Sequence, residues 1–148
     1  MKTTLLKSFI SVVLLALIIS CKVEPQAIEY GKDQCSFCKM NVVDKTHSAQ
    51  YVTKKGKQFK FDAIECMVND ISEKDVNEIA IFLVADYGNP GVMVDALTST
   101  YIISKAIKSP MGANLSALSS KDKAVELQSK FEGEIFTWEL LRQKLADK

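Results

Sequence analysis

The chain has 148 residues, with 19 Lys and Arg residues against 18 Asp and Glu residues. This near-neutral balance excludes the basic footprint that nucleic-acid-binding proteins carry, and the length suits one compact domain with a buried core.

The N-terminus has the features of a bacterial lipoprotein signal. Residues 1–7 contain two lysines and no acid, and the apolar run FISVVLLALIIS follows. That run is too short to span a membrane comfortably and is typical of a secretory signal. It ends in IISC, which resembles a lipobox, so we expect residues 1–20 to be removed and Cys21 to be lipidated. The mature protein would then be anchored to a bacterial membrane and face the periplasm or the cell exterior.

Removal of the signal leaves 17 basic residues against 18 acidic ones. Three cysteines remain besides Cys21, so a complete disulfide framework is excluded and at least one thiol is free or bound to something. Residues 21–33 are largely polar, with one proline and one glycine, and we interpret them as a lipidated tether. Residues 34–148 are the predicted metal-binding domain.

The first predicted elements are a hairpin and a helix. Residues 49–53 and 58–61 flank a glycine-bearing turn and favour β structure. Asp62 followed by Glu65 is typical of a capping box at the start of a helix. Four apolar residues with helical spacing predict the buried face of that helix: Ile64, Met67, Val68 and Ile71.

The second half predicts strands followed by helices. Residues 78–86 form a dense apolar run that indicates a buried strand, and shorter β candidates lie at 101–106 and 114–119. Residues 119–131 predict a helix that stops near a glycine, and Thr137 can cap a final helix. These elements indicate an α+β fold.

The segment CSFCKM, residues 35–40, concentrates sulfur. The spacing of Cys35 and Cys38 allows both thiols to reach one metal ion or each other. A redox dithiol would follow a buried strand, but here a charged linker precedes the motif. Met40 adds a thioether, which is a poor ligand for zinc and a good one for Cu(I).

The remaining candidate ligands are scattered along the chain. Met111 is flanked by proline and glycine, so packing explains it poorly. Cys66 lies beside the buried face of the first helix. His47 is the only imidazole and has no persuasive partner for a Ser/His/Asp triad. With the two cysteines of CSFCKM, Cys66 and His47 would also complete a four-ligand zinc site, which stays open as an alternative.

The motifs together resemble the NosL family, the copper-binding accessory lipoproteins of nitrous oxide reductase maturation. They are the lipobox, C-x-x-C-x-M, His47, Phe61-Asp62 with Cys66-Met67, Asp86-Tyr87, Ser-Pro-Met-Gly at 109–112, and Gly133. The match extends from about residue 34 to 145. It implies two small β-β-α-β units packed together, similar to part of organomercurial lyase. A faint similarity between the two halves of the sequence agrees with such a repeat.

The resemblance also implies a function. It describes a monomeric Cu(I) carrier, not an enzyme, that passes copper to a maturation complex of an ABC transporter and a periplasmic β-helical protein. Nitrous oxide reductase would be the final recipient. The ligand candidates carried over are Cys38, Met40, Cys66 and Met111, with Cys35 and His47 as further options.

Two positions depart from the family pattern. Many relatives have glycine where this chain has Lys39, and the usual Gly-Gly near the C-terminus is Glu132-Gly133 here. If the first glycine serves a positive-φ turn, lysine would strain that turn. Two other classes of function stay open: a periplasmic thiol enzyme, either a dithiol oxidoreductase or lyase-like, and a structural zinc-binding module.

Overall fold

The computed structural model describes residues 23–147. The predicted signal peptide and the predicted lipid attachment at Cys21 lie outside the described residues. Within residues 23–147, no helix has the length and apolar character needed to cross a membrane.

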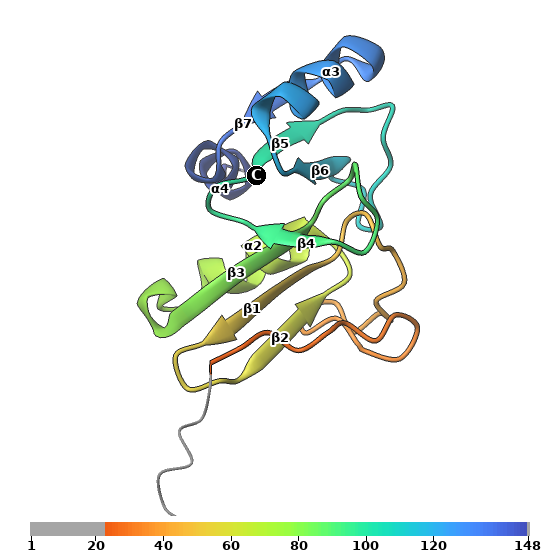
Figure 1. Cartoon of the computed structure of the whole chain (residues 1–148). Coiled ribbons are helices and arrows are strands. Elements are labelled where there is room, and N and C mark those ends of the chain that lie inside the picture. Colours follow the sequence, from red (N-terminus) through yellow and green to blue (C-terminus); the bar gives the residue numbers. More distant parts are fainter. Residues whose placement is uncertain (1–22, 148) are drawn as a thin grey trace, which may run out of the picture.

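The first half of the described chain forms a four-stranded antiparallel sheet, which occupies the lower half of Figure 1. The strand order is β2-β1-β3-β4, and a helix follows the first hairpin. The elements are β1 (Ala49–Thr53), β2 (Gln58–Phe61), α2 (Ile64–Ser72), a 3₁₀ turn η1 (Val76–Glu78), β3 (Ile79–Ala85) and β4 (Met93–Asp95).

The second half forms a smaller, three-stranded sheet, seen in the upper half of Figure 1 with α3 above it. Its strand order is β6-β5-β7, and all pairs are antiparallel. The elements are β5 (Thr100–Ile103), β6 (Leu115–Leu118), α3 (Lys121–Phe131), β7 (Glu134–Phe136) and α4 (Trp138–Ala146).

The two halves have the same topology. In each, a hairpin leads into a helix, and the next strand returns to pair with the first strand of the hairpin on its free side. The predicted α+β fold with two β-β-α-β units is therefore confirmed, and β4 and α4 are additions to that plan. The similarity to organomercurial lyase stays a prediction.

Most predicted elements are confirmed close to their expected bounds. The hairpin strands match residue for residue, and Gly56 in their turn has φ +78°. The final helix begins after Thr137, whose hydroxyl accepts a hydrogen bond from the Leu140 amide. Strand β7 was not predicted from the sequence, because its three residues carry no periodic signal of their own.

The predicted capping box is wrong, although the buried face of α2 is confirmed. The N-cap residue is Ala63, and it makes no side-chain hydrogen bond. Asp62 and Glu65 are both buried and bind groups far away in the sequence instead. Tertiary partners have therefore replaced the local contacts that the pattern indicates.

The main hydrophobic core lies between the first sheet, α2, the second sheet and α4. Trp138 of α4 contacts Phe82 of β3 and Tyr101 of β5, with ring centroids 5.9 Å apart in both pairs. A second cluster under α3 contains only three buried residues: Ile102, Leu118 and Ala124. The first unit is therefore the better packed of the two.

The segment before the domain contacts the edge strand β2. The Gln58 side chain bonds the backbone of Glu24 and Gln26, and Lys60 Nζ donates to the Ala27 carbonyl at 2.8 Å. This part of the predicted tether therefore lies along the sheet edge.

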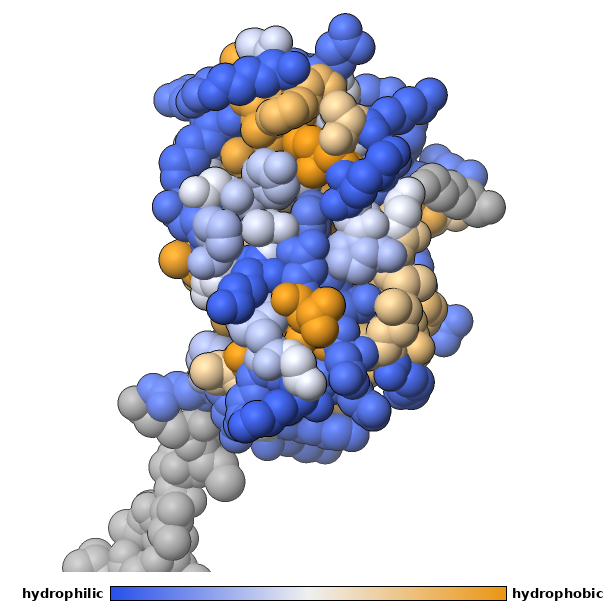
Figure 2. Space-filling model, turned by 90° about the vertical axis from the view of Figure 1, so that its right-hand side faces the viewer, coloured by the Kyte–Doolittle hydropathy of each residue, from blue (hydrophilic) through white to orange (hydrophobic). Residues whose placement is uncertain are grey.

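On the face drawn in Figure 2, the apolar side chains lie in more than one group. Figure 2 shows them in small groups separated by hydrophilic residues. Within residues 23–147, the exposed large apolar residues are Phe37, Met40, Val43, Val92, Leu97, Met111, Val125, Phe131 and Leu140.

Candidate metal centre

Four potential ligand atoms meet at one end of the first unit. The Sγ atoms of Cys35, Cys38 and Cys66 and a carboxylate oxygen of Asp62 all lie within 4.8 Å of one another. Cys35, Asp62 and Cys66 are buried, and Cys38 is partly exposed. The three cysteines in the described part of the chain are free thiols. The cluster therefore offers one metal ion up to three sulfur ligands and one oxygen ligand.

A tight loop presents the first two thiols. The Cys35 amide donates to the Met40 carbonyl at 2.7 Å, and the Lys39 amide donates back to the Cys35 carbonyl at 3.1 Å. The Ser36 amide donates to the Lys60 carbonyl and the Lys60 amide donates to Ser36 Oγ, which docks the loop on the end of β2. Both thiols are thereby aimed at the residues that follow this strand.

Lys39 closes this loop in a strained conformation. Its φ is +68°, in the left-handed region where a non-glycine residue is disfavoured by about 1–2 kcal/mol. Its Nζ atom donates to the Ser36 carbonyl at 2.6 Å and so ties the side chain to the loop. The loop therefore keeps the positive-φ turn expected for a glycine.

The other two groups come from the junction between β2 and α2. Asp62 directly follows β2, and Cys66 lies in the first turn of α2. The Cys38 thiol donates to Asp62 Oδ1 at 3.3 Å. Sequence reasoning missed Asp62 as a site residue, because the capping-box pattern supplied a local explanation. No sequence pattern signals its role, because the thiol that it contacts lies 24 residues away on Cys38.

The thiols differ in acidity because of their mutual contacts. The Cys66 thiol donates to Cys35, and backbone amides of Asp62 and Cys38 add to this effect, so the pKa of Cys35 falls to about 6. Burial raises the pKa of Cys38 to about 11, and the Cys35 thiolate and burial raise the pKa of Cys66. One thiolate and two thiols are therefore expected at neutral pH in the absence of metal.

The predicted thioethers lie at the surface rather than inside the cluster. Met111 is 43% exposed and lines a pocket of about 300 Å³ that also reaches Cys66 and Phe37. Met40 is 53% exposed, at the end of the cysteine loop. Met111 therefore lines the same pocket as Cys66, a member of the thiol cluster. Met40 is near the cluster in sequence, two residues after Cys38.

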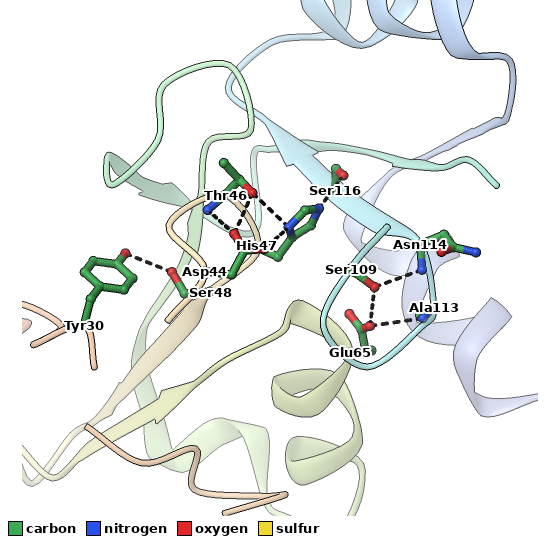
Figure 3. A network of polar contacts seen from close by, with 10 residues as sticks. All are labelled: Tyr30, Asp44, Thr46, His47, Ser48, Glu65, Ser109, Ala113, Asn114 and Ser116. Atoms are coloured by element: carbon green, nitrogen blue, oxygen red, sulfur yellow. Dashed lines mark hydrogen bonds and ion pairs between the residues drawn. The ribbon is translucent and has the colours of Figure 1, made fainter. Parts of the chain in front are cut away.

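His47 is held in a different place. Its Nδ1 atom lies 2.9 Å from Asp44 Oδ2, and its Nε2 atom lies 3.1 Å from Ser116 Oγ on β6 (Figure 3). The structure thus supplies the triad partners that the sequence did not reveal. Ser116 is fully buried, so its hydroxyl cannot meet a substrate. His47 connects the two units, and its predicted role as a metal ligand stays a prediction.

Comparisons with known proteins bear on the family and the fold of the chain. The NosL family model matches residues 25–146 of the chain. The fold is similar to the crystal structure of the copper chaperone NosL from Shewanella denitrificans, with a TM-score of 0.69 and 17% sequence identity. That alignment covers 80% of this chain and 95% of the other. No curated protein matches the sequence.

Proposed function

The chain belongs to the NosL family, and from this premise we propose that it is a carrier that binds one Cu(I) ion at the Cys35, Cys38, Asp62 and Cys66 cluster. The convergence of three thiols within 4.8 Å carries the proposal. Thiolate sulfur is soft and favours Cu(I) over the harder divalent ions. The likeness to a crystallised copper chaperone supports the same metal.

The cluster suits uptake followed by release. Cys35 and Cys66 supply buried sulfur, while Cys38 is partly exposed and lies nearest to solvent. In the metal-free protein, the carboxylate of Asp62 accepts a hydrogen bond from the Cys38 thiol. Carboxylate oxygen is a weak ligand for a soft ion such as Cu(I). A carrier must release its ion as well as bind it. A site with few thiolates and optional thioethers meets this need, because it holds Cu(I) less firmly than a cage made of thiolates alone.

We further propose that the carrier acts outside the cytoplasm, held at the membrane by a lipid on Cys21. The support is the lipobox-like sequence at residues 18–21. The family resemblance points to a maturation complex of an ABC transporter and a β-helical protein as the recipient, with nitrous oxide reductase at the end of the route. Globomycin-sensitive processing and a mass for the mature N-terminus that includes acyl chains would test the anchor.

A zinc-binding module is the second candidate function. The observation that favours it is the donor set itself, because three cysteines and one carboxylate suit tetrahedral zinc. A thiol enzyme is disfavoured, since the most acidic thiol, Cys35, is fully buried and cannot attack a substrate from solvent.

Anaerobic titration of the mature domain against a competing Cu(I) chelator tests the proposal. We expect one tightly bound equivalent, and a loss of more than about 100-fold in affinity for Cys66→Ser and for Cys38→Ser, because direct ligands matter more than the residues that orient them. Met67→Leu is the matched thioether control, since Met67 is fully buried in the core and should leave affinity unchanged.

Two outcomes would contradict the Cu(I) carrier. One is unchanged copper affinity in both cysteine variants, which would place the ion elsewhere. The other is retention of zinc when both metals are offered, together with unfolding when zinc is removed, which would establish the structural zinc module.

A further inference from the structure

Loop 109–114, between β5 and β6, is fastened to α2 by one side chain. Glu65 Oε1 accepts hydrogen bonds from the Ser109 hydroxyl at 2.7 Å and from the Ala113 amide at 3.2 Å (Figure 3). Ser109 Oγ in turn accepts from the Asn114 amide at 2.9 Å. Gly112 has φ +80°, which turns the chain so that the Ala113 amide faces the carboxyl group. Glu65 thus closes the loop from both of its ends.

Glu65 is an unusual residue for this position. It is 5% exposed, and its Oε2 atom is the buried side-chain atom among the described residues that lacks a hydrogen-bond partner. A buried polar group without full pairing costs on the order of 1–3 kcal/mol. An apolar residue would continue the buried face of α2 without this cost. The contact to the loop is therefore what Glu65 supplies.

The loop forms one wall of the pocket that leads to the metal centre. Met111 on the loop is 43% exposed, whereas Cys66, which lines the same pocket, is 1% exposed. Met111 therefore lies toward the mouth and Cys66 toward the base. Because Glu65 immediately precedes Cys66, the residue that fastens the loop and the thiol at the base belong to the same turn of α2.

We propose that Glu65 is a positioning residue that holds the Met111 thioether over Cys66, so that this thioether can bind the ion as it enters or leaves the cluster. The inference rests on the proposed Cu(I) binding. Its physical basis is that a ligand on a loop needs an anchoring contact to keep its geometry, and loss of such orienting contacts typically costs about 10- to 100-fold in metal affinity.

A double-mutant cycle in the complete mature domain tests the inference. We expect Glu65→Ala to weaken Cu(I) binding by about 10-fold or more, as Met111→Leu does, and the combined variant to be no weaker than Met111→Leu alone. In NMR spectra, the Met111 methyl resonance should shift on Cu(I) addition in the wild type and not in Glu65→Ala. Glu65→Gln should restore both, because its amide oxygen can still accept from Ser109 and Ala113.

Ser109→Ala provides a milder variant in case Glu65→Ala does not fold. Its matched control is Ser104→Ala, because Ser104 is also buried, donates to the Phe131 carbonyl at 2.8 Å and accepts from the Ala106 amide. We expect Ser109→Ala to reduce the Met111 methyl shift and Ser104→Ala to preserve it.

The outcomes separate this inference from the proposed function. If the wild type binds Cu(I) and Glu65→Ala leaves the affinity and the Met111 shift unchanged, the positioning role is wrong while the carrier stands. The positioning role would also be wrong if Glu65→Ala weakened Cu(I) binding by the same factor in the wild type and in Met111→Leu. Failure of the wild type to bind Cu(I) would instead remove the proposed function itself.

Discussion

The two β-β-α-β units share a topology but differ in how firmly their helices are packed. In the first unit, six of the nine residues of α2 are buried, including Cys66. In the second unit, only Ala124 of the eleven residues of α3 is buried. All three described cysteines belong to the first unit, and the second contributes the loop that carries Met111. The buried thiols of Cys35 and Cys66 therefore lie in the better packed unit, whereas the exposed thioether of Met111 lies on a loop of the less packed one.

The largest expected effect comes from filling the close contact in the second unit. Gly133 has φ +125°, and a Cβ atom there would lie 2.5 Å from the Ile103 carbonyl oxygen of β5. We therefore expect Gly133→Ala to lower the free energy of unfolding by about 3 kcal/mol, because both the backbone and the neighbouring strand would have to move. Denaturant unfolding measures this.

Gly56→Ala in the first unit is the control for that substitution. Gly56 has φ +78° but no atom near its added Cβ, so only the backbone term of about 1 kcal/mol remains. Equal losses in the two variants would show that the close approach to β5 does not matter.

A smaller effect is expected from cutting one polar connection between the units, the contact of His47 with Ser116. His47→Ala leaves Ser116 without its partner and Asp44 without its ring contact. We expect unfolding to become easier by about 2 kcal/mol, with Cu(I) affinity unchanged. Chemical denaturation and copper competition, performed on the same variant, provide the two measurements.

Ser116→Ala should behave in the same way as His47→Ala but more mildly. Ser48→Ala is its matched control, since Ser48 is also fully buried but bonds Tyr30 within the first unit. A loss of Cu(I) affinity in His47→Ala without a matching loss in Ser116→Ala would make His47 a ligand rather than a connection.

The acidity of Cys35 predicts a moderate pH dependence of the metal-free protein. Folding lowers the pKa of Cys35 from 9.0 to about 6, so the stabilisation from its thiolate is fully present above pH 9 and is lost as pH falls through about 6. The slope should be at most about 1.4 kcal/mol per pH unit. Thiolate absorbance at pH 7.5 should disappear in Cys35→Ser and persist in Cys38→Ser. Absorbance that rises only near pH 9 in the wild type would contradict this assignment.

The smallest effects concern one strained residue in each unit. Lys39 has φ +68°, and Glu132, after α3, has φ +56° with ψ −179°. Glycine adopts both conformations without strain, but it also adds conformational entropy to the unfolded chain. Once that entropy cost is subtracted from the relieved strain, Lys39→Gly and Glu132→Gly should each raise the free energy of unfolding by about 1 kcal/mol. Thermal unfolding measures the gain. Lys39→Ala, which removes the side chain but not the strain, should show none; a gain of the same size there would assign the effect to the side chain.

The elements that could be predicted from the sequence are those specified by local patterns. The hairpin around Gly56 and the apolar face of α2 depend on residues a few positions apart, and both are confirmed. The departures at Lys39 and Glu132 were also informative, because a missing glycine points to a positive φ.

The rest depends on contacts between distant segments. Asp62 accepts a hydrogen bond from the thiol of Cys38, 24 residues away, and Glu65 accepts one from the hydroxyl of Ser109, 44 residues away. Helix-capping rules describe both residues as local partners, so no pattern in the sequence could assign them to the metal centre or to the Met111 loop. The contact of His47 with Ser116 crosses 69 residues, so the sequence likewise gives no sign of it.

The most direct test of Cu(I) binding at the thiol cluster is X-ray absorption spectroscopy of the mature domain loaded with one equivalent of Cu(I). We expect a copper environment dominated by sulfur, with no imidazole scattering, and a reduced sulfur contribution in Cys66→Ser. An environment dominated by nitrogen, or a sulfur contribution that Cys66→Ser leaves unchanged, would contradict the assignment of the ion to the thiol cluster of the first unit.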